Sequence, residues 1–123
     1  MLTIAIAQRN FTIGDFDANT AAVLDQMRRA SDGGAQMVVF SELTLSAYYP
    51  GDLFEDAAFL RNTDAALQTV LQASKRWPAL VTVLGTARPN AGPGKPLHNA
   101  LLAIQNGQIV AEYYKQLLPT YGI

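Results

Sequence analysis

Short apolar runs alternate with longer amphipathic segments over most of this chain, and the alternation restricts the fold more than any other feature. The first run, Leu2–Gln8, is almost entirely apolar, and "QMVVF" (36–40) and "PALVTVLGTA" (78–87) follow it. Runs of this length predict buried strands, and we expect the first to be buried on both faces. Strands that alternate with helices predict an α/β fold with a largely parallel sheet.

Two amphipathic segments separate these strands and predict helices. The first has apolar residues at helical spacing: Val23, Met27 and Ala30. Asp17 or Asn19 is its expected N-cap, and the glycines of "SDGGA" (31–35) are expected to end it. The second helix is predicted from about Asn62 to Trp77. Its inner face is predicted to consist of Leu67, Val70, Leu71 and Ser74.

A β-hairpin is predicted near the end of the chain. Asn106-Gly107 lies between "HNALLAIQ" (98–105) and "IVAEYY" (109–114), and this dipeptide is a strong hairpin signal. The segment "RPNAGPGKP" (88–96) predicts an exposed loop before it. No further helix pattern follows the hairpin, although such a sheet is normally covered by helices. We therefore expect residues 1–123 to be the N-terminal portion of a larger domain, with no second domain present.

Composition excludes several classes of partner. Half of the residues are hydrophobic and 15% are charged, which is typical of a globular protein. The net charge is −1 and no basic run occurs, so we expect no nucleic-acid partner. No apolar stretch approaches the roughly 18 to 20 residues that cross a bilayer, so we expect no membrane association and a cytoplasmic location. The chain has no cysteine, and therefore no disulfide and no thiolate metal site.

Glu42 is the first candidate for chemistry. It follows Phe40-Ser41 at the carboxyl end of the second predicted strand. Ligands bind at this edge of open α/β sheets, and a partly desolvated carboxylate there could act as a general base. A glutamate that caps a loop or pairs with a surface lysine would give the same pattern, so position alone leaves both interpretations open.

Lys115 is the second candidate, because it ends the last predicted strand after Tyr113 and Tyr114. A lysine held there could stabilise an oxyanion, whereas an edge-strand lysine also protects against aggregation. His98 is the only histidine, and a structural hydrogen-bonding role is the simpler interpretation. With no second histidine and no cysteine at ligand spacing, we expect no metal site.

Longer motifs resemble a known family. The segment "VVFSELTLSAYYPGDLF" (38–54) resembles the first motif of the nitrilase, or carbon–nitrogen hydrolase, superfamily, and "IAIAQRNFTIGDFDAN" (4–19) resembles its N-terminal strand and loop. The resemblance extends over essentially the whole chain. It implies a nitrilase-like α-β-β-α sandwich, of which this chain would be the N-terminal part. That superfamily uses a glutamate, a lysine and a cysteine, and Glu42 and Lys115 match the first two.

The resemblance also narrows the expected reaction. Pro50, Asp52, Leu53 and "LLPTYG" (117–122) resemble the amidase domain of glutamine-dependent NAD synthetases. This implies that glutamine is the substrate and that Tyr121 contacts it. The ammonia released would serve the ATP-dependent amidation of deamido-NAD to NAD. ATP, Mg and deamido-NAD would bind a separate C-terminal domain, so no cofactor is expected in this portion.

By the same resemblance, Glu42 would be the general base and Lys115 would stabilise the oxyanion of a thioester mechanism. Ala47 replaces a usual glycine, Tyr49 replaces a frequent proline, and the nucleophilic cysteine is absent. We therefore expect no glutaminase activity from the chain alone.

Two alternatives remain at the level of sequence. The chain could belong to a standalone nitrilase-type amidase that acts on another amide. If the native chain ends at Ile123, it could instead be a non-catalytic binding or assembly module. The resemblance further implies a homo-oligomer when the protein is full length.

Overall fold

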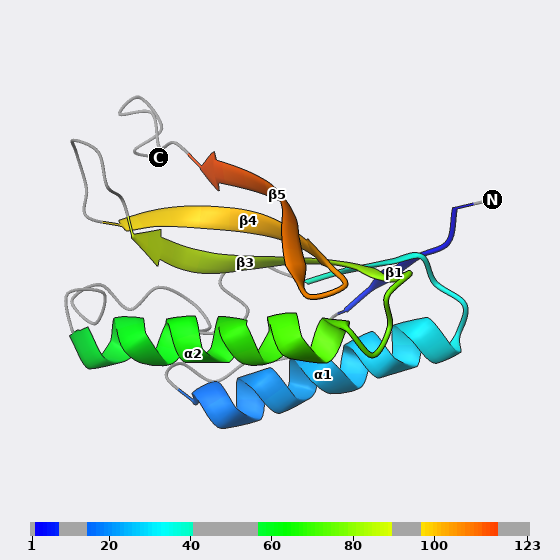
Figure 1. Cartoon of the computed structure of the whole chain (residues 1–123), viewed down its shortest axis with the longest axis horizontal. Coiled ribbons are helices and arrows are strands. Elements are labelled where there is room, and N and C mark those ends of the chain that lie inside the picture. Colours follow the sequence, from blue (N-terminus) through cyan, green and yellow to red (C-terminus); the bar gives the residue numbers. More distant parts are fainter. Residues whose placement is uncertain (1, 8–14, 41–56, 90–96, 116–123) are drawn as a thin grey trace, which may run out of the picture.

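A mixed five-stranded sheet with two helices on one face makes up the part of the chain that the structure describes (Figure 1). The structure is a computed structural model, and it describes residues 2–7, 15–40, 57–89 and 97–115. The predicted α/β class is confirmed. Neither described helix has the length and apolar character that crossing a membrane requires.

The five strands lie side by side in the order in which they occur in the chain. They are β1 (Ile4–Ile6), β2 (Met37–Val39), β3 (Val81–Pro89), β4 (Leu97–Gln105) and β5 (Gln108–Lys115). The pairs β1–β2 and β2–β3 are parallel, whereas β3–β4 and β4–β5 are antiparallel. Two of the four strand pairs in the described sheet are parallel and two are antiparallel, because β4 and β5 add antiparallel pairs. The prediction of a largely parallel sheet was therefore wrong for the described strands.

The first helix, α1 (Phe16–Asp32), begins at a different cap from the predicted one. Asp15 is the N-cap, and its Oδ1 accepts a hydrogen bond from the backbone N–H of Ala18 at 3.2 Å. The prediction of Asp17 or Asn19 was wrong, because both residues already lie inside the helix. Asp17 belongs to the first turn, where its negative charge interacts favourably with the positive end of the helix dipole. Asn19 is buried.

The glycine pair after α1 ends the helix as predicted. The backbone N–H of Gly33 donates to the carbonyl oxygen of Arg29 at 2.9 Å. Gly34 then adopts a φ of +81°, a left-handed conformation that glycine reaches without steric cost.

The second helix, α2 (Ala57–Ser74), is longer at its start than predicted and shorter at its end. It begins five residues before Asn62 and ends three residues before Trp77. The predicted inner face is confirmed, since all four of its residues are buried: Leu67, Val70, Leu71 and Ser74.

The predicted hairpin forms at Asn106-Gly107, with φ angles of +50° and +81°. Two positive φ angles in succession are typical of a type I′ turn, which matches the twist of the flanking strands. The turn is attached to the end of α2, because the N–H of Gly107 donates to the Ser74 Oγ at 2.8 Å. The Lys75 side chain lies directly over Gly107.

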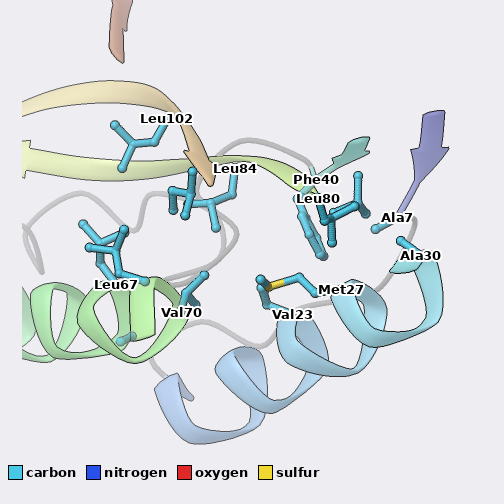
Figure 2. Packing of buried hydrophobic residues seen from close by; sticks show 14 of the residues in the cluster. Ala7, Val23, Met27, Ala30, Phe40, Leu67, Val70, Leu80, Leu84 and Leu102 are labelled. Atoms are coloured by element: carbon cyan, nitrogen blue, oxygen red, sulfur yellow. The ribbon is translucent and has the colours of Figure 1, made fainter. Parts of the chain in front are cut away.

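The core lies between the two helices and the sheet face that they cover (Figure 2). Figure 2 shows Met27 of α1 near Phe40 and Leu80, and Leu67 of α2 near Leu84 of β3 and Leu102 of β4. All of these side chains are almost completely buried. These side chains hold the strands at fixed positions beneath the helices. The sheet is therefore a rigid base for any groups carried at its edges.

The opposite sheet face is open in the described part of the molecule. Its exposed residues include Ile4 and Ile6 of β1, Leu101 of β4 and Tyr113 of β5, and Ile6 is 72% exposed. The prediction that the first strand is buried on both faces was wrong for the described residues. Both helices lie on the same side of the sheet, so only one face of each strand is covered by them (Figure 1).

Candidate functional site: the carboxyl edge of the sheet

The carboxyl ends of four strands meet at one edge of the sheet. Strands β1, β2 and β3 are parallel, so all three end at this edge. The direction reverses at β4 and again at β5, so β5 also ends there, and β3 and β5 point the same way in Figure 1. In open α/β sheets this is the edge at which ligands bind.

Lys115 is the last residue of β5 and lies at this edge. Its backbone pairs with Asn99 of β4, which in turn pairs with Ala87 of β3. The predicted position of Lys115 at the end of a strand is thereby confirmed. Its backbone is fixed by the ladder, so the residue is held at the end of the strand.

Glu42 and Tyr121 both lie outside the described residues. The described residue nearest to Glu42 in the chain is Phe40, which is buried and directly follows β2. Its N–H donates to the carbonyl oxygen of Val83 at 2.8 Å, so the chain is still attached to β3 two residues before Glu42. The roles assigned to Glu42, Lys115 and Tyr121 stay predictions.

The width of the edge limits how the predicted groups could act together. Strands β3 and β4 separate β2 from β5. Neighbouring strands lie about 4.8 Å apart, so the backbones of β2 and β5 are roughly 14 Å apart across the sheet. Groups carried at the ends of β2 and β5 would have to bridge that distance to act together. The described part of the candidate site therefore consists of the strand ends at this edge, from β2 to β5.

Two buried hydroxyl groups on β3 were not singled out by sequence reasoning. Thr82 and Thr86 are fully buried, and neither Oγ1 has a hydrogen-bond partner among the described residues. Thr86 is the one nearer to the carboxyl edge, three residues before β3 ends at Pro89. Threonine is common in strands of any kind, so the sequence pattern gave no signal that these hydroxyls lack partners.

We also looked among the described residues for a metal-binding cluster and for a hollow that could be an alternative candidate site. No cluster of three or more His, Asp or Glu side chains suited to a metal ion occurs among the residues that the structure describes. A hollow of about 630 Å³ lies between α1 and α2 and is lined by helix residues such as Leu24 and Ala65, together with the Asp15 cap. None of its described lining residues is a predicted site residue, so we do not assign the candidate site to it.

Comparison with known sequences gives a consistent result. The carbon–nitrogen hydrolase family model matches residues 3–122. The glutamine-dependent NAD(+) synthetase of Thermotoga maritima is 33% identical over 122 residues, which cover 99% of this chain and 20% of that protein. The chain thus spans about one fifth of this relative.

Comparison with solved structures gives the same fold. The glutamine-dependent NAD+ synthetase of Acinetobacter baumannii superimposes with a TM-score of 0.77 at 25% identity, over 98% of this chain and 22% of that chain. A Nesterenkonia AN1 amidase of the nitrilase superfamily superimposes with a TM-score of 0.81 at 24% identity, over 95% of this chain and 44% of that chain. The described helices and mixed sheet therefore match part of the nitrilase fold.

Proposed function

The chain belongs to the carbon–nitrogen hydrolase family, and from this membership we propose that it is part of an enzyme that hydrolyses glutamine to supply ammonia for NAD synthesis. One observation carries the proposal: the chain aligns over 99% of its length with the Thermotoga maritima glutamine-dependent NAD(+) synthetase at 33% identity. This chain spans only 20% of that relative, so the synthetase reaction itself is proposed for the larger protein.

The proposed chemistry is amide hydrolysis through a thioester. A cysteine thiolate attacks the carboxamide carbon of glutamine, Glu42 takes the thiol proton, and the same proton then leaves with the departing ammonia. Glu42 next removes a proton from water, which attacks the thioester to release glutamate and restore the thiol. Lys115 stabilises the oxyanion of each tetrahedral intermediate, and Tyr121 contacts glutamine.

The position of Lys115 supports its proposed part in this scheme. Its backbone pairs with Asn99 at the carboxyl ends of the parallel strands, which is where ligands bind in open α/β sheets. The nucleophile is not among the 123 residues, because the chain contains no cysteine. The complete reaction therefore needs a cysteine from outside them. ATP, Mg and deamido-NAD are likewise proposed to bind outside this portion.

The test uses the polypeptide purified from its native source. We expect it to form NAD from deamido-NAD and ATP with either glutamine or ammonium as the nitrogen donor. Glu42→Gln should reduce the glutamine-dependent rate at least a hundredfold and leave the ammonium-dependent rate unchanged, because only glutamine hydrolysis needs the base. Equal loss of both rates would contradict a role for Glu42 confined to amide hydrolysis.

A standalone amidase is the second candidate, because the carbon–nitrogen hydrolase family that matches this chain does not specify the amide substrate. The superposition on the Nesterenkonia amidase, at 24% identity, shows the fold alone and does not decide between the two candidates. The two candidates differ in their product. Hydrolysis of simple amides without any amidation of deamido-NAD would support the amidase and contradict the synthetase.

A further inference from the structure

Strand β5 is one edge of the sheet, since β4 is its one described neighbour. With eight residues it is much longer than β1, the three-residue strand at the opposite edge. The outward side of an edge strand carries backbone N–H and C=O groups that have no strand to pair with. A strand of this length therefore offers a template to which a further strand could add.

The second half of β5 is exposed on both of its faces. Tyr113 is level with Leu101 on the open face of the sheet, and it is 66% exposed. Tyr114 is level with Ala100, which is buried, yet Tyr114 itself is exposed. Figure 1 shows this part of β5, drawn in red, away from both helices. The helix layer therefore does not cover it.

Native edge strands usually carry features that prevent pairing, such as a proline, a bulge or a lysine within the strand. β5 has no proline, and its lysine is the terminal residue. Its bulge lies near the turn, where Val110 has no residue opposite it in β4. The bulge twists the first half of the strand away from a partner. Residues 111–115 lie beyond the bulge in a regular ladder with β4, so this stretch is free to accept a strand on its outward side.

We propose that residues 111–115 pair in antiparallel fashion with the same residues of a second copy of this chain, joining the two sheets across a two-fold axis. A second copy is the occupant that the strand itself favours, because an antiparallel pair of identical strands is self-complementary and leaves neither edge open. The pairing does not depend on the chemistry proposed for glutamine.

The pleat of the strand limits the register of this pairing. An axis perpendicular to the sheet keeps each face on its own side, so the axis must pass through a residue and its own counterpart. An axis at Glu112 would place two like charges directly opposite, which is destabilising. An axis at Ala111 would require the bulged Val110 to pair, and an axis at Tyr114 would shorten the described overlap.

The register that remains has its axis at Tyr113, the midpoint of residues 111–115. The two Tyr113 side chains then form an aromatic cross-strand pair on the open face. On the other face, Glu112 of each copy lies opposite Tyr114 of the other. Within one chain the Tyr114 hydroxyl already donates to the Glu112 carboxylate, so the same donor and acceptor types meet across the axis. The paired stretch is short, so we expect a reversible dimer whose population rises with concentration.

The first experiment is sedimentation equilibrium of the 123-residue protein at concentrations up to about 1 mM. We expect the mass to rise from one chain toward two. Tyr114→Glu should weaken the dimer about tenfold, since it creates two like-charge pairs with Glu112 in each dimer. Tyr114→Lys places opposite charges there and should bind at least as tightly as the unaltered protein. Amide spectra of each variant report whether the fold is retained.

Cross-linking tests the register directly, because the chain has no cysteine of its own. Tyr113→Cys places the two introduced thiols directly opposite, where the Cα atoms of an antiparallel pair are about 4.5 to 5.5 Å apart and a disulfide can form. Val110→Cys is the matched control, since Val110 is also exposed and lies three residues earlier on the same strand. Its two copies would be about 20 Å apart, so mild oxidation should cross-link Tyr113→Cys and not Val110→Cys.

A second control separates edge pairing from stacking of the open sheet faces. Ile6→Lys puts a charge on the open face at the opposite edge of the sheet, and it should leave the dimer unchanged. A monomer at every concentration would overturn the proposal. Equal cross-linking of Tyr113→Cys and Val110→Cys, or a dimer that Ile6→Lys abolishes and Tyr114→Glu leaves intact, would also overturn it.

Discussion

At the scale of single residues, two features affect the stability of the protein and cannot be read from the pattern of strands and helices. One is the pair of buried hydroxyls on β3, and the other is the cap of α1. In both cases the residue type is common in its element, so the energetic consequence depends on the immediate neighbours. Each case gives a measurable change in stability.

Thr82→Val is expected to stabilise the protein by about 1 kcal/mol. The substitution keeps the volume of the side chain and removes a buried hydroxyl that has no partner among the described residues. Urea unfolding of both proteins measures the difference. Thr69→Val is the control, because the exposed Thr69 hydroxyl donates to the Ala65 carbonyl oxygen and its removal should change stability by less than about 0.5 kcal/mol. A loss of stability in Thr82→Val would mean that the hydroxyl has a partner after all.

Asp15→Ala is expected to destabilise the protein by about 1 kcal/mol, because it removes the side-chain acceptor of the Ala18 N–H at the start of α1. Asp17→Ala changes a residue with the same charge two positions later. It removes only a favourable interaction with the helix dipole, worth about 0.3 to 1 kcal/mol. Thermal unfolding of the two variants compares them directly. A larger loss in Asp17→Ala would restore the predicted cap and contradict the observed one.

At the scale of elements, the hairpin is coupled to α2 through its turn. Ser74 Oγ donates to the Leu71 carbonyl oxygen at 2.7 Å and accepts the Gly107 N–H at 2.8 Å. A second bond runs from Gln105 Nε2 to the Pro78 carbonyl oxygen at 3.2 Å. The turn thus holds β4 and β5 against the end of the helix. This coupling fixes the turn end of the hairpin, and Lys115 lies at the other end of β5.

Gly107→Ala is expected to destabilise the protein more than Gly34→Ala. Both glycines have a φ of +81°, where an L-residue costs roughly 1 kcal/mol. A Cβ at position 34 meets nothing within 4 Å, whereas at position 107 it would come within 2.5 Å of the Lys75 Cε. Denaturant unfolding measures both losses. In the double variant Gly107→Ala/Lys75→Ala, the extra loss of stability relative to Gly34→Ala should disappear. Equal losses in the two single glycine variants would contradict the expectation and show that the Lys75 side chain moves aside.

The elements that the sequence predicted well are those whose signals are local. The inner face of α2 follows from apolar spacing, and the hairpin follows from Asn106-Gly107, which fixes the turn type by itself. Helix starts were harder. The second helix was predicted to begin at about Asn62, yet Asn62 is an exposed residue inside α2, because good helix formers before it extend the helix to Ala57.

At the scale of the whole molecule, the sequence could not tell which sheet face the helices cover. Apolar residues occupy both faces of β1 and β2, so periodicity alone predicts burial on both. The structure shows Val38 buried toward the helices while Ile4 and Ile6 of β1 remain exposed. The position of Lys115 could be predicted because a single hairpin sets it. Glu42 and Tyr121 lie outside the described residues, so the roles assigned to them stay predictions.

The absence of cysteine leads to a prediction about the 123-residue protein itself. It should release no glutamate or ammonia from glutamine above background, because Glu42 has no thiol to deprotonate and no thioester can form. The oxyanion stabilisation proposed for Lys115 would act only after a nucleophile has attacked, and water is a far weaker nucleophile than a thiolate.

The measurement is glutamate and ammonia release at saturating glutamine, with the Glu42→Gln/Lys115→Met double variant as the blank. Equal rates in the two proteins are expected. A faster rate in the unaltered protein would show that the carboxylate and the lysine activate water without a covalent intermediate. In that case the proposed need for a cysteine nucleophile would be wrong, because Glu42 and Lys115 would then suffice for amide hydrolysis.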